Sequence, residues 1–135
     1  RAQQRAGRPF HYAVVGISDL SNTRILYDAA AQWGVRYLPD DECRIDLLAN
    51  VLQFVRVFME SVDHVYLTID LDAAPAALGI APTVVQAVAQ LVAGSGKLMH
   101  ADVAELNPSL DIDGRTARIA ARLVHRLIAK RKVAS

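Results

Sequence analysis

The chain has 135 residues, of which 53% are hydrophobic and 21% are charged, and its formal net charge at pH 7 is +1. This composition excludes a disordered chain, and the balanced charge gives no strong field for nucleic acid or an anionic membrane. The single cysteine, Cys43, excludes an intramolecular disulfide, and no apolar run reaches the roughly 18 residues of a membrane-spanning helix. We therefore expect residues 1–135 to form one globular domain in the cytoplasm.

The first residues give no sign of a targeting segment. Residues 1–8 are polar and basic and lack the apolar core of a signal peptide. The first residue is Arg1 rather than Met, so we expect the chain to begin inside a longer protein.

The first half of the chain predicts two strands and two helices. Residues 10–17 are almost all apolar or aromatic, which favours a strand covered on both faces. Apolar residues at helical spacing predict a helix over 25–33, ended by Gly34. A short strand over 35–38 and a long helix over 42–61 follow, with Asp40 or Asp41 as the N-cap of that helix.

The second half repeats this alternation. Residues 65–70 form an apolar strand, and Pro82 suits the first turn of a helix that ends before Gly94. A strand over 98–104 and an amphipathic helix over 116–128 complete the chain. Strands that alternate with helices predict an α/β fold with a mostly parallel sheet and helices on its faces.

Two carboxylates mark the end of the strand over residues 65–70. Side chains alternate along a strand, so Asp70 and Asp72 point the same way as Thr68, and Leu71 points oppositely. Two acids so close together repel each other unless one is protonated or a cation lies between them, and hard divalent cations prefer oxygen ligands. The alternative is a pair of solvated acids that form a turn.

Glu105 directly follows the strand over residues 98–104 and therefore lies at the same edge of a parallel sheet as the Asp pair. A carboxylate in this place can hold a cationic substrate group through paired hydrogen bonds. The alternative is a surface glutamate at the end of a strand.

Other chemically active residue types form no convincing site. The histidines have no ligand spacing, Cys43 has no recognisable base partner, and residues 94–97 follow a helix, which is the wrong context for a phosphate loop. The arginines of the last helix are typical of a solvated face or a subunit contact. These histidines and arginines are His11, His64, His100, His125, Arg115, Arg118, Arg122 and Arg126.

Three segments together resemble the C-terminal half of the ureohydrolase (arginase/agmatinase) superfamily: Leu-Thr-Ile-Asp-Leu-Asp at 67–72, Asp-Val-Ala-Glu-Leu-Asn-Pro at 102–108 and Gly-Arg-Thr-Ala at 114–117. Further details resemble the formimidoylglutamase branch of that family. They are Phe-His-Tyr at 10–12, Gly-Ile at 16–17, Ser-Asn-Thr at 21–23 and Asp-Ile-Asp at 111–113. The resemblance covers nearly the whole chain.

The resemblance implies an arginase-like three-layer α/β/α fold, of which this chain is the C-terminal portion. It implies two manganese ions, with Asp70 and Asp72 as metal ligands and Glu105 facing the amidine-like group of the substrate. The reaction implied is the conversion of N-formimidoyl-L-glutamate and water to L-glutamate and formamide in histidine degradation. A small-molecule substrate is thus expected, with neither nucleic acid nor membrane as a partner, and members of this family are commonly homo-oligomers.

The chain departs from the family pattern in two respects. The upstream metal-ligand segments, one Gly-Gly-x-His-like and one Asp-Ala-His-x-Asp-like, do not occur, and the loop after Asp72 is shorter than the family's. We therefore expect the chain to be inactive alone. Two alternatives stay open: a ureohydrolase that acts on agmatine, guanidinobutyrate or arginine, and a non-catalytic α/β remnant that serves as an interaction module.

Overall fold

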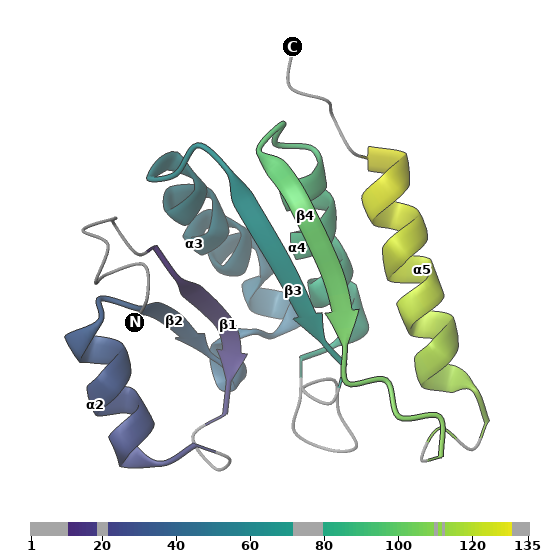
Figure 1. Ribbon diagram of the computed structural model, residues 1–135, viewed down its shortest axis with the longest axis horizontal. Coiled ribbons are helices and arrows are strands. Elements are labelled where there is room, and N and C mark those ends of the chain that lie inside the picture. The colour runs from purple at the N-terminus through teal and green to yellow at the C-terminus, as the bar shows by residue number, and fades with distance from the viewer. Residues whose placement is uncertain (1–10, 19–21, 72–79, 110, 112, 131–135) are drawn as a thin grey trace.

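The computed structural model describes residues 11–18, 22–71, 80–109, 111 and 113–130. Strands and helices alternate along the chain as the sequence predicts (Figure 1). None of the described helices has the length and apolar character needed to cross a membrane. The elements are β1 (Ala13–Ile17), α2 (Arg24–Gln32), β2 (Arg36–Pro39), the 3₁₀ turns η1 (Asp40–Glu42) and η2 (Ile45–Leu47), α3 (Leu48–Glu60), β3 (Val65–Asp70), α4 (Pro82–Ala93), β4 (Leu98–Ala104) and α5 (Arg115–Lys130).

The strands form two parallel pairs. β1 pairs with β2 from Ala13 opposite Arg36, and β3 pairs with β4 up to Asp70 opposite Ala104. Both pairs are parallel, as predicted, but within the described residues they form two separate two-stranded sheets. The expectation that β1 is covered on both faces is wrong for this chain, because all five of its residues are only half-buried.

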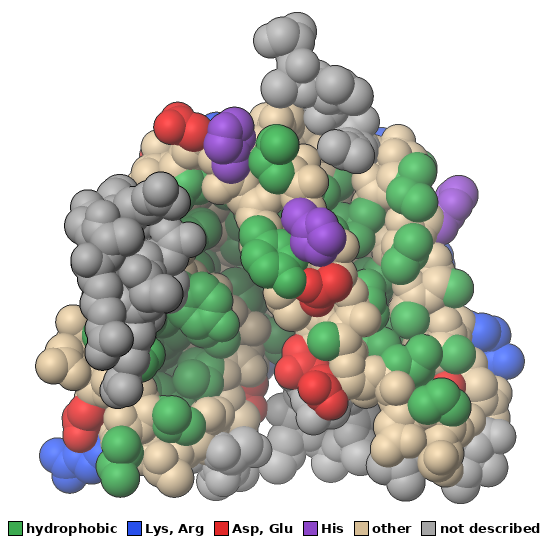
Figure 2. Space-filling view, viewed as in Figure 1, with side chains coloured by type: hydrophobic (Ala, Val, Ile, Leu, Met, Phe, Trp, Pro, Cys, Tyr) green, Lys and Arg blue, Asp and Glu red, His purple; other side chains and the backbone are tan. Residues whose placement is uncertain are grey.

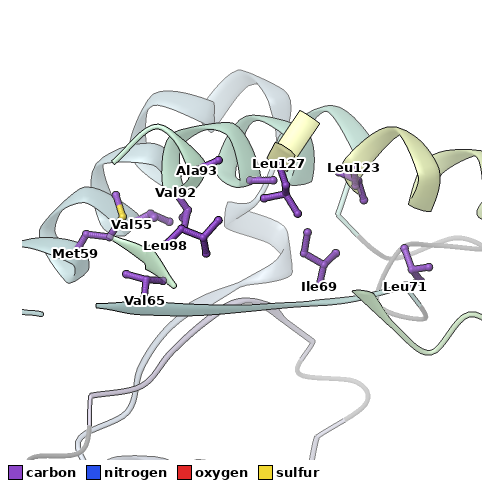
Figure 3. Close-up of a cluster of buried hydrophobic side chains, with 11 residues drawn as sticks. Val55, Met59, Val65, Ile69, Leu71, Val92, Ala93, Leu98, Leu123 and Leu127 are labelled. Atoms are coloured by element: carbon purple, nitrogen blue, oxygen red, sulfur yellow. The ribbon is translucent and has the colours of Figure 1, made fainter. Parts of the chain in front are cut away.

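The main core lies between β3–β4 and the helices α3, α4 and α5. Figure 3 shows β3 edge-on, with Val65 and Ile69 pointing toward the helices that cover one face of the strand pair. Tyr66, Thr68 and Asp70 alternate with them and are exposed. α3, α4 and α5 bury apolar residues in this core, among them Val55, Met59, Ala89, Val92, Ala93, Leu123 and Leu127.

A smaller cluster joins β1 and β2 to the starts of α3 and α4. Its buried members are Cys43, Val51, Ile80 and Val84. Gly16 is packed against it with φ at +85°, and a Cβ built on Gly16 would lie 2.0 Å from Cδ1 of Ile80. Only glycine meets both the backbone conformation and the close approach at this point.

The long helix predicted over residues 42–61 begins later than expected. Arg44 is extended, with φ at −91° and ψ at 159°, and its guanidinium binds the carboxylate of Asp46 at 2.8 Å. This extended residue separates η1 from η2, and α3 begins only at Leu48. The acids at 40–42 therefore form a short 3₁₀ turn rather than the first turn of a long helix.

Candidate metal centre

Asp70 is the last residue of β3 and its side chain is exposed. Thr68 is exposed as well, whereas Ile69 and Leu71 are buried. The alternation predicted for this strand is thus confirmed as far as Leu71. Asp72 lies outside the described residues, so its place beside Asp70 remains a prediction.

Glu105 lies at the same edge of the β3–β4 sheet. Asp70 pairs with Ala104, and the N–H of Leu71 donates to the carbonyl oxygen of Ala104 at 3.1 Å. Glu105 is the next residue along the chain, and it is exposed. Figure 2 shows acidic side chains gathered over the carboxyl ends of these two strands. The carboxyl ends of β3 and β4 therefore lie side by side, as predicted.

The backbone of Glu105 has φ at +60°, and no other described residue except glycine has a positive φ. The left-handed region costs an L-residue with a Cβ about 1–2 kcal/mol. Such strain is typical of residues whose orientation matters for function. The sequence carried no signal for it, since a positive φ is usually indicated by glycine, asparagine or aspartate at the position itself.

The described residues match a hard divalent cation in donor type but do not complete a ligand set. Asp70 and Glu105 offer carboxylate oxygens, which Mn²⁺ and Mg²⁺ prefer. No group of three or more His, Cys, Asp or Glu residues within the described ranges could hold a metal ion. Within the described ranges, Asp70 and Glu105 therefore do not by themselves form a metal centre.

A polar cluster that the sequence did not reveal lies on the open face of β3–β4. The hydroxyl of Tyr66 donates to the carboxylate of Asp102, across the two strands. The ring of His100 stands edge-on to that of Tyr66, with centroids 5.0 Å apart. The register brings these residues together after an irregularity between Val65 and Tyr66, which no local pattern predicts.

The other candidates have structural surroundings. Lys97 donates from Nζ to the carbonyl oxygens of Met59 and Val62, at 2.6 and 2.7 Å, so it fixes the end of α3 rather than a phosphate. Burial, together with Asp40 and Glu42, raises the pKa of the Cys43 thiol to about 11, which keeps it protonated.

The remaining candidates are dispersed. His11, His64 and His125 are exposed, as are Arg115, Arg118 and Arg122, whereas Arg126 is half-buried. Arg115 forms an exposed ion pair with Asp113 at 3.4 Å, which is typical of a solvated face.

The segment after Glu105 leads to the start of α5. The carboxylate of Asp111 accepts hydrogen bonds from the backbone N–H groups of Thr116 and Ala117, each at 2.8 Å. These hydrogen bonds hold the pKa of Asp111 below its ordinary value. This cap was not predicted, although an Asp a few residues before an amphipathic helix is a usable signal.

The family model of the arginase family matches residues 1–129. The chain belongs to the arginase family. Among its relatives, the formimidoylglutamase of Nocardia farcinica is 53% identical, over 92% of this chain and 42% of that protein. The formimidoylglutamase of Ralstonia nicotianae is also 53% identical, over 92% of this chain and 41% of that protein. This arginase-family chain thus spans about two fifths of the length of the curated relatives it matches.

Solved structures show the same fold. The crystal structure of formimidoylglutamase from Bacillus subtilis matches with a TM-score of 0.76 and 19% identity, over 87% of this chain and 40% of that one. The arginase of Bacillus caldovelox matches with a TM-score of 0.75 and 22% identity, over 88% and 43% respectively. The predicted arginase-like fold is therefore confirmed, and this member of the arginase family builds part of its three-layer α/β/α architecture.

Proposed function

We propose that this chain supplies part of the active site of a manganese-dependent hydrolase that converts N-formimidoyl-L-glutamate and water to L-glutamate and formamide. The observation that carries the proposal is the meeting of Asp70 and Glu105 at one sheet edge. It occurs in a chain that is about half identical to proteins named formimidoylglutamase. The reaction breaks the bond between the formimidoyl carbon and the glutamate nitrogen, and water supplies the oxygen of formamide.

In this proposal Asp70 and Asp72 are metal ligands. Their carboxylates are hard, anionic donors, and an aspartate at the end of a strand is held by the ladder hydrogen bonds behind it. Bound manganese ions would supply Lewis-acid chemistry and lower the pKa of water. The further ligands that a two-metal centre needs would come from the part of the protein that this chain does not cover.

Glu105 binds the substrate in this proposal. The formimidoyl group is an amidine, which is cationic when protonated and presents N–H groups to a carboxylate. The backbone of Glu105 has a positive φ of 60°, and such conformations are concentrated at functional sites, which supports this role. We assign no catalytic base within the chain.

A chimera tests the proposal. The chain replaces the matching part of the Nocardia farcinica formimidoylglutamase, and bound manganese and released formamide are measured. Asp70→Ala and Asp72→Ala should each reduce bound manganese, whereas Glu105→Gln should keep the metal and lower activity at least about 100-fold. Asp63→Asn is the matched control, because Asp63 is an exposed acid at the opposite end of β3. A chimera that binds no manganese or releases no formamide would contradict the proposal.

The substrate is tested in the same chimera. Agmatine, guanidinobutyrate and arginine carry a guanidino group in place of the formimidoyl group and are the competing substrates. We expect kcat/KM for N-formimidoyl-L-glutamate to exceed that for each of them. A higher value for a guanidino compound would reassign the substrate and leave the hydrolase proposal standing.

A further inference from the structure

We propose that His100 and Asp102, positioned by Tyr66, bind a transition-metal cation of the Zn²⁺ type on the face of β3–β4 that points away from the helices. One imidazole nitrogen and one carboxylate oxygen would hold the cation, and water would complete its coordination. Figure 2 shows histidine and acidic side chains close together on this face of the strand pair. The site is separate from the candidate centre at the carboxyl edge of the sheet.

The register of the two strands brings these side chains together. An irregularity between Val65 and Tyr66 places His100, rather than Met99, opposite Tyr66. Such irregularities commonly re-aim a side chain next to a functional site. Asp102 follows His100 by two residues on the same strand, so both side chains leave the same face, about 6.6 Å apart along the strand. The two donor groups can therefore approach one point from the same side.

Tyr66 contacts both proposed ligands from the neighbouring strand. Its hydroxyl donates a hydrogen bond to the carboxylate of Asp102. Its ring lies edge-on to the imidazole of His100, with centroids 5.0 Å apart. Metal-binding carboxylates and imidazoles are usually oriented by outer partners of this kind. The ligands would therefore be held in place before the cation arrives.

Solvent and an added cation can reach this cluster. Tyr66 is 64% exposed, His100 is exposed, and Asp102 is half-buried. Parallel strands that are covered on both faces are nearly continuous in apolar residues, whereas this face presents polar groups at alternate positions. Among the described residues, no Lys or Arg forms an ion pair with Asp102. The negative charge of its carboxylate is therefore available to a cation.

The donor types select a different cation from the one proposed for the sheet edge. A mixed nitrogen and oxygen set favours Zn²⁺ or Cu²⁺, whereas carboxylates alone favour Mn²⁺ or Mg²⁺. His100 also lies four residues, or about 13 Å, before Ala104, the residue that pairs with Asp70. No three His, Cys, Asp or Glu residues of the described ranges form a metal-binding group, so this site has two such ligands only.

Calorimetric titration of the 135-residue chain with ZnCl₂ tests the proposal. We expect one saturable site, and an excess of Mn²⁺ should not displace the zinc. His100→Ala should weaken zinc binding at least about tenfold, because loss of a ligand costs no less than loss of an outer partner. His125→Ala is the matched control, since His125 is an exposed histidine on α5. No saturable binding below about 1 mM zinc, or an equal loss in both variants, would overturn the proposal.

The second ligand and its positioning residue are tested in the same titration. Asp102→Asn should also weaken binding at least about tenfold, with Asp63→Asn as the exposed acidic control. Tyr66→Phe keeps the ring but removes the hydroxyl, so we expect a smaller loss of zinc affinity than for either ligand variant. An unchanged affinity in Asp102→Asn would contradict the site.

Two further measurements separate this site from other places that could take zinc. Zinc should raise the thermal midpoint of the unmodified chain and of His125→Ala, but not that of His100→Ala, because only a bound cation stabilises the folded state. Amide chemical shifts should change most around His100 and Asp102 when zinc is added. Changes centred on Asp70 and Glu105 would assign the zinc to the sheet edge and overturn this proposal, while leaving the hydrolase proposal untouched.

Discussion

The two strand pairs differ in how much of their surface this chain covers. In the β3–β4 pair, Val65, Ile69 and Leu98 are buried against three helices. In β1, α2 and β2 no residue is buried, and Ile25 of α2 is 77% exposed. The chain thus packs a large apolar core against the β3–β4 pair. The β1–β2 pair is packed only against the small cluster around Cys43 and Ile80. We expect the β1–β2 region to unfold at a lower denaturant concentration than the β3–β4 region.

The largest effect should come from Gly16→Ala, which disrupts the packing of β1 against the small cluster around Cys43 and Ile80. The new Cβ would meet Ile80 at 2.0 Å, and alanine at φ +85° is strained, so we expect a loss of about 2–4 kcal/mol in the free energy of unfolding. Urea denaturation measures this loss. The Cys43 thiol is buried and protonated, so its labelling should be faster in this variant, in which the small cluster is less tightly packed.

Gly34→Ala is the matched control for this substitution. Gly34 also has a positive φ, at +66°, but nothing lies within 4 Å of a Cβ built on it. It should lose only the strain term of about 1–2 kcal/mol. Ile80→Ala combined with Gly16→Ala should recover part of the stability lost through the clash. A double-mutant cycle measures the coupling between the two positions. Equal losses of unfolding free energy for the two glycine variants, with no coupling to Ile80, would contradict the role of the contact between Gly16 and Ile80.

A smaller effect is expected within the β3–β4 region from Lys97→Met. The substitution keeps the length of the stem but removes two charged hydrogen bonds to the carbonyl groups at the end of α3. We expect a loss of about 1–3 kcal/mol in the free energy of unfolding. Lys130→Met, at an exposed position of α5, should change it little. If both variants lose the same unfolding free energy, the hydrogen bonds from Lys97 to the end of α3 make no specific contribution to stability.

Glu105→Gly should act in the opposite direction. Glycine relieves the strain at φ +60° but loses more backbone entropy on folding, so we expect a net gain of about 0.5–1 kcal/mol in unfolding free energy. The same substitution should lower formamide release by the chimera, because the carboxylate is lost. A loss of stability with unchanged activity would mean that Glu105 has a structural role only.

The sequence predicted the local elements better than their pairing. β3 and β4 have the predicted bounds, because each is an apolar run between turn-forming residues. Helix α3 begins later than predicted, because Arg44 takes an extended conformation bound to Asp46. The separation of the two sheets depends on long-range pairing, which no local pattern encodes.

The candidate site was predictable to a similar degree. The placement of Asp70 and Glu105 at one edge followed from strand alternation and parallel pairing. The contact between Tyr66 and Asp102 and the positive φ of Glu105 did not, since both depend on the register and conformation of the folded strands. Asp72 lies outside the described residues and stays a prediction.

The smallest effect is expected from Asp111→Asn, which tests whether α5 belongs firmly to the β3–β4 region. The backbone N–H groups of Ala117 and Thr116 lower the pKa of Asp111, so the ionised form stabilises the folded chain. This stabilisation is present above the ordinary aspartate pKa and is lost as the pH falls through the lower, folded-state pKa. Urea midpoints measured from pH 6 to pH 2.5 should therefore fall less steeply for Asp111→Asn than for the unmodified chain. Asp113→Asn is the control, because the carboxylate of Asp113 is exposed and accepts one backbone hydrogen bond, from Arg115. Parallel pH profiles for the Asp111 variant and the unmodified chain would show that the cap does not hold α5, and that apolar residues such as Leu123 and Leu127 fix the helix to the core without it.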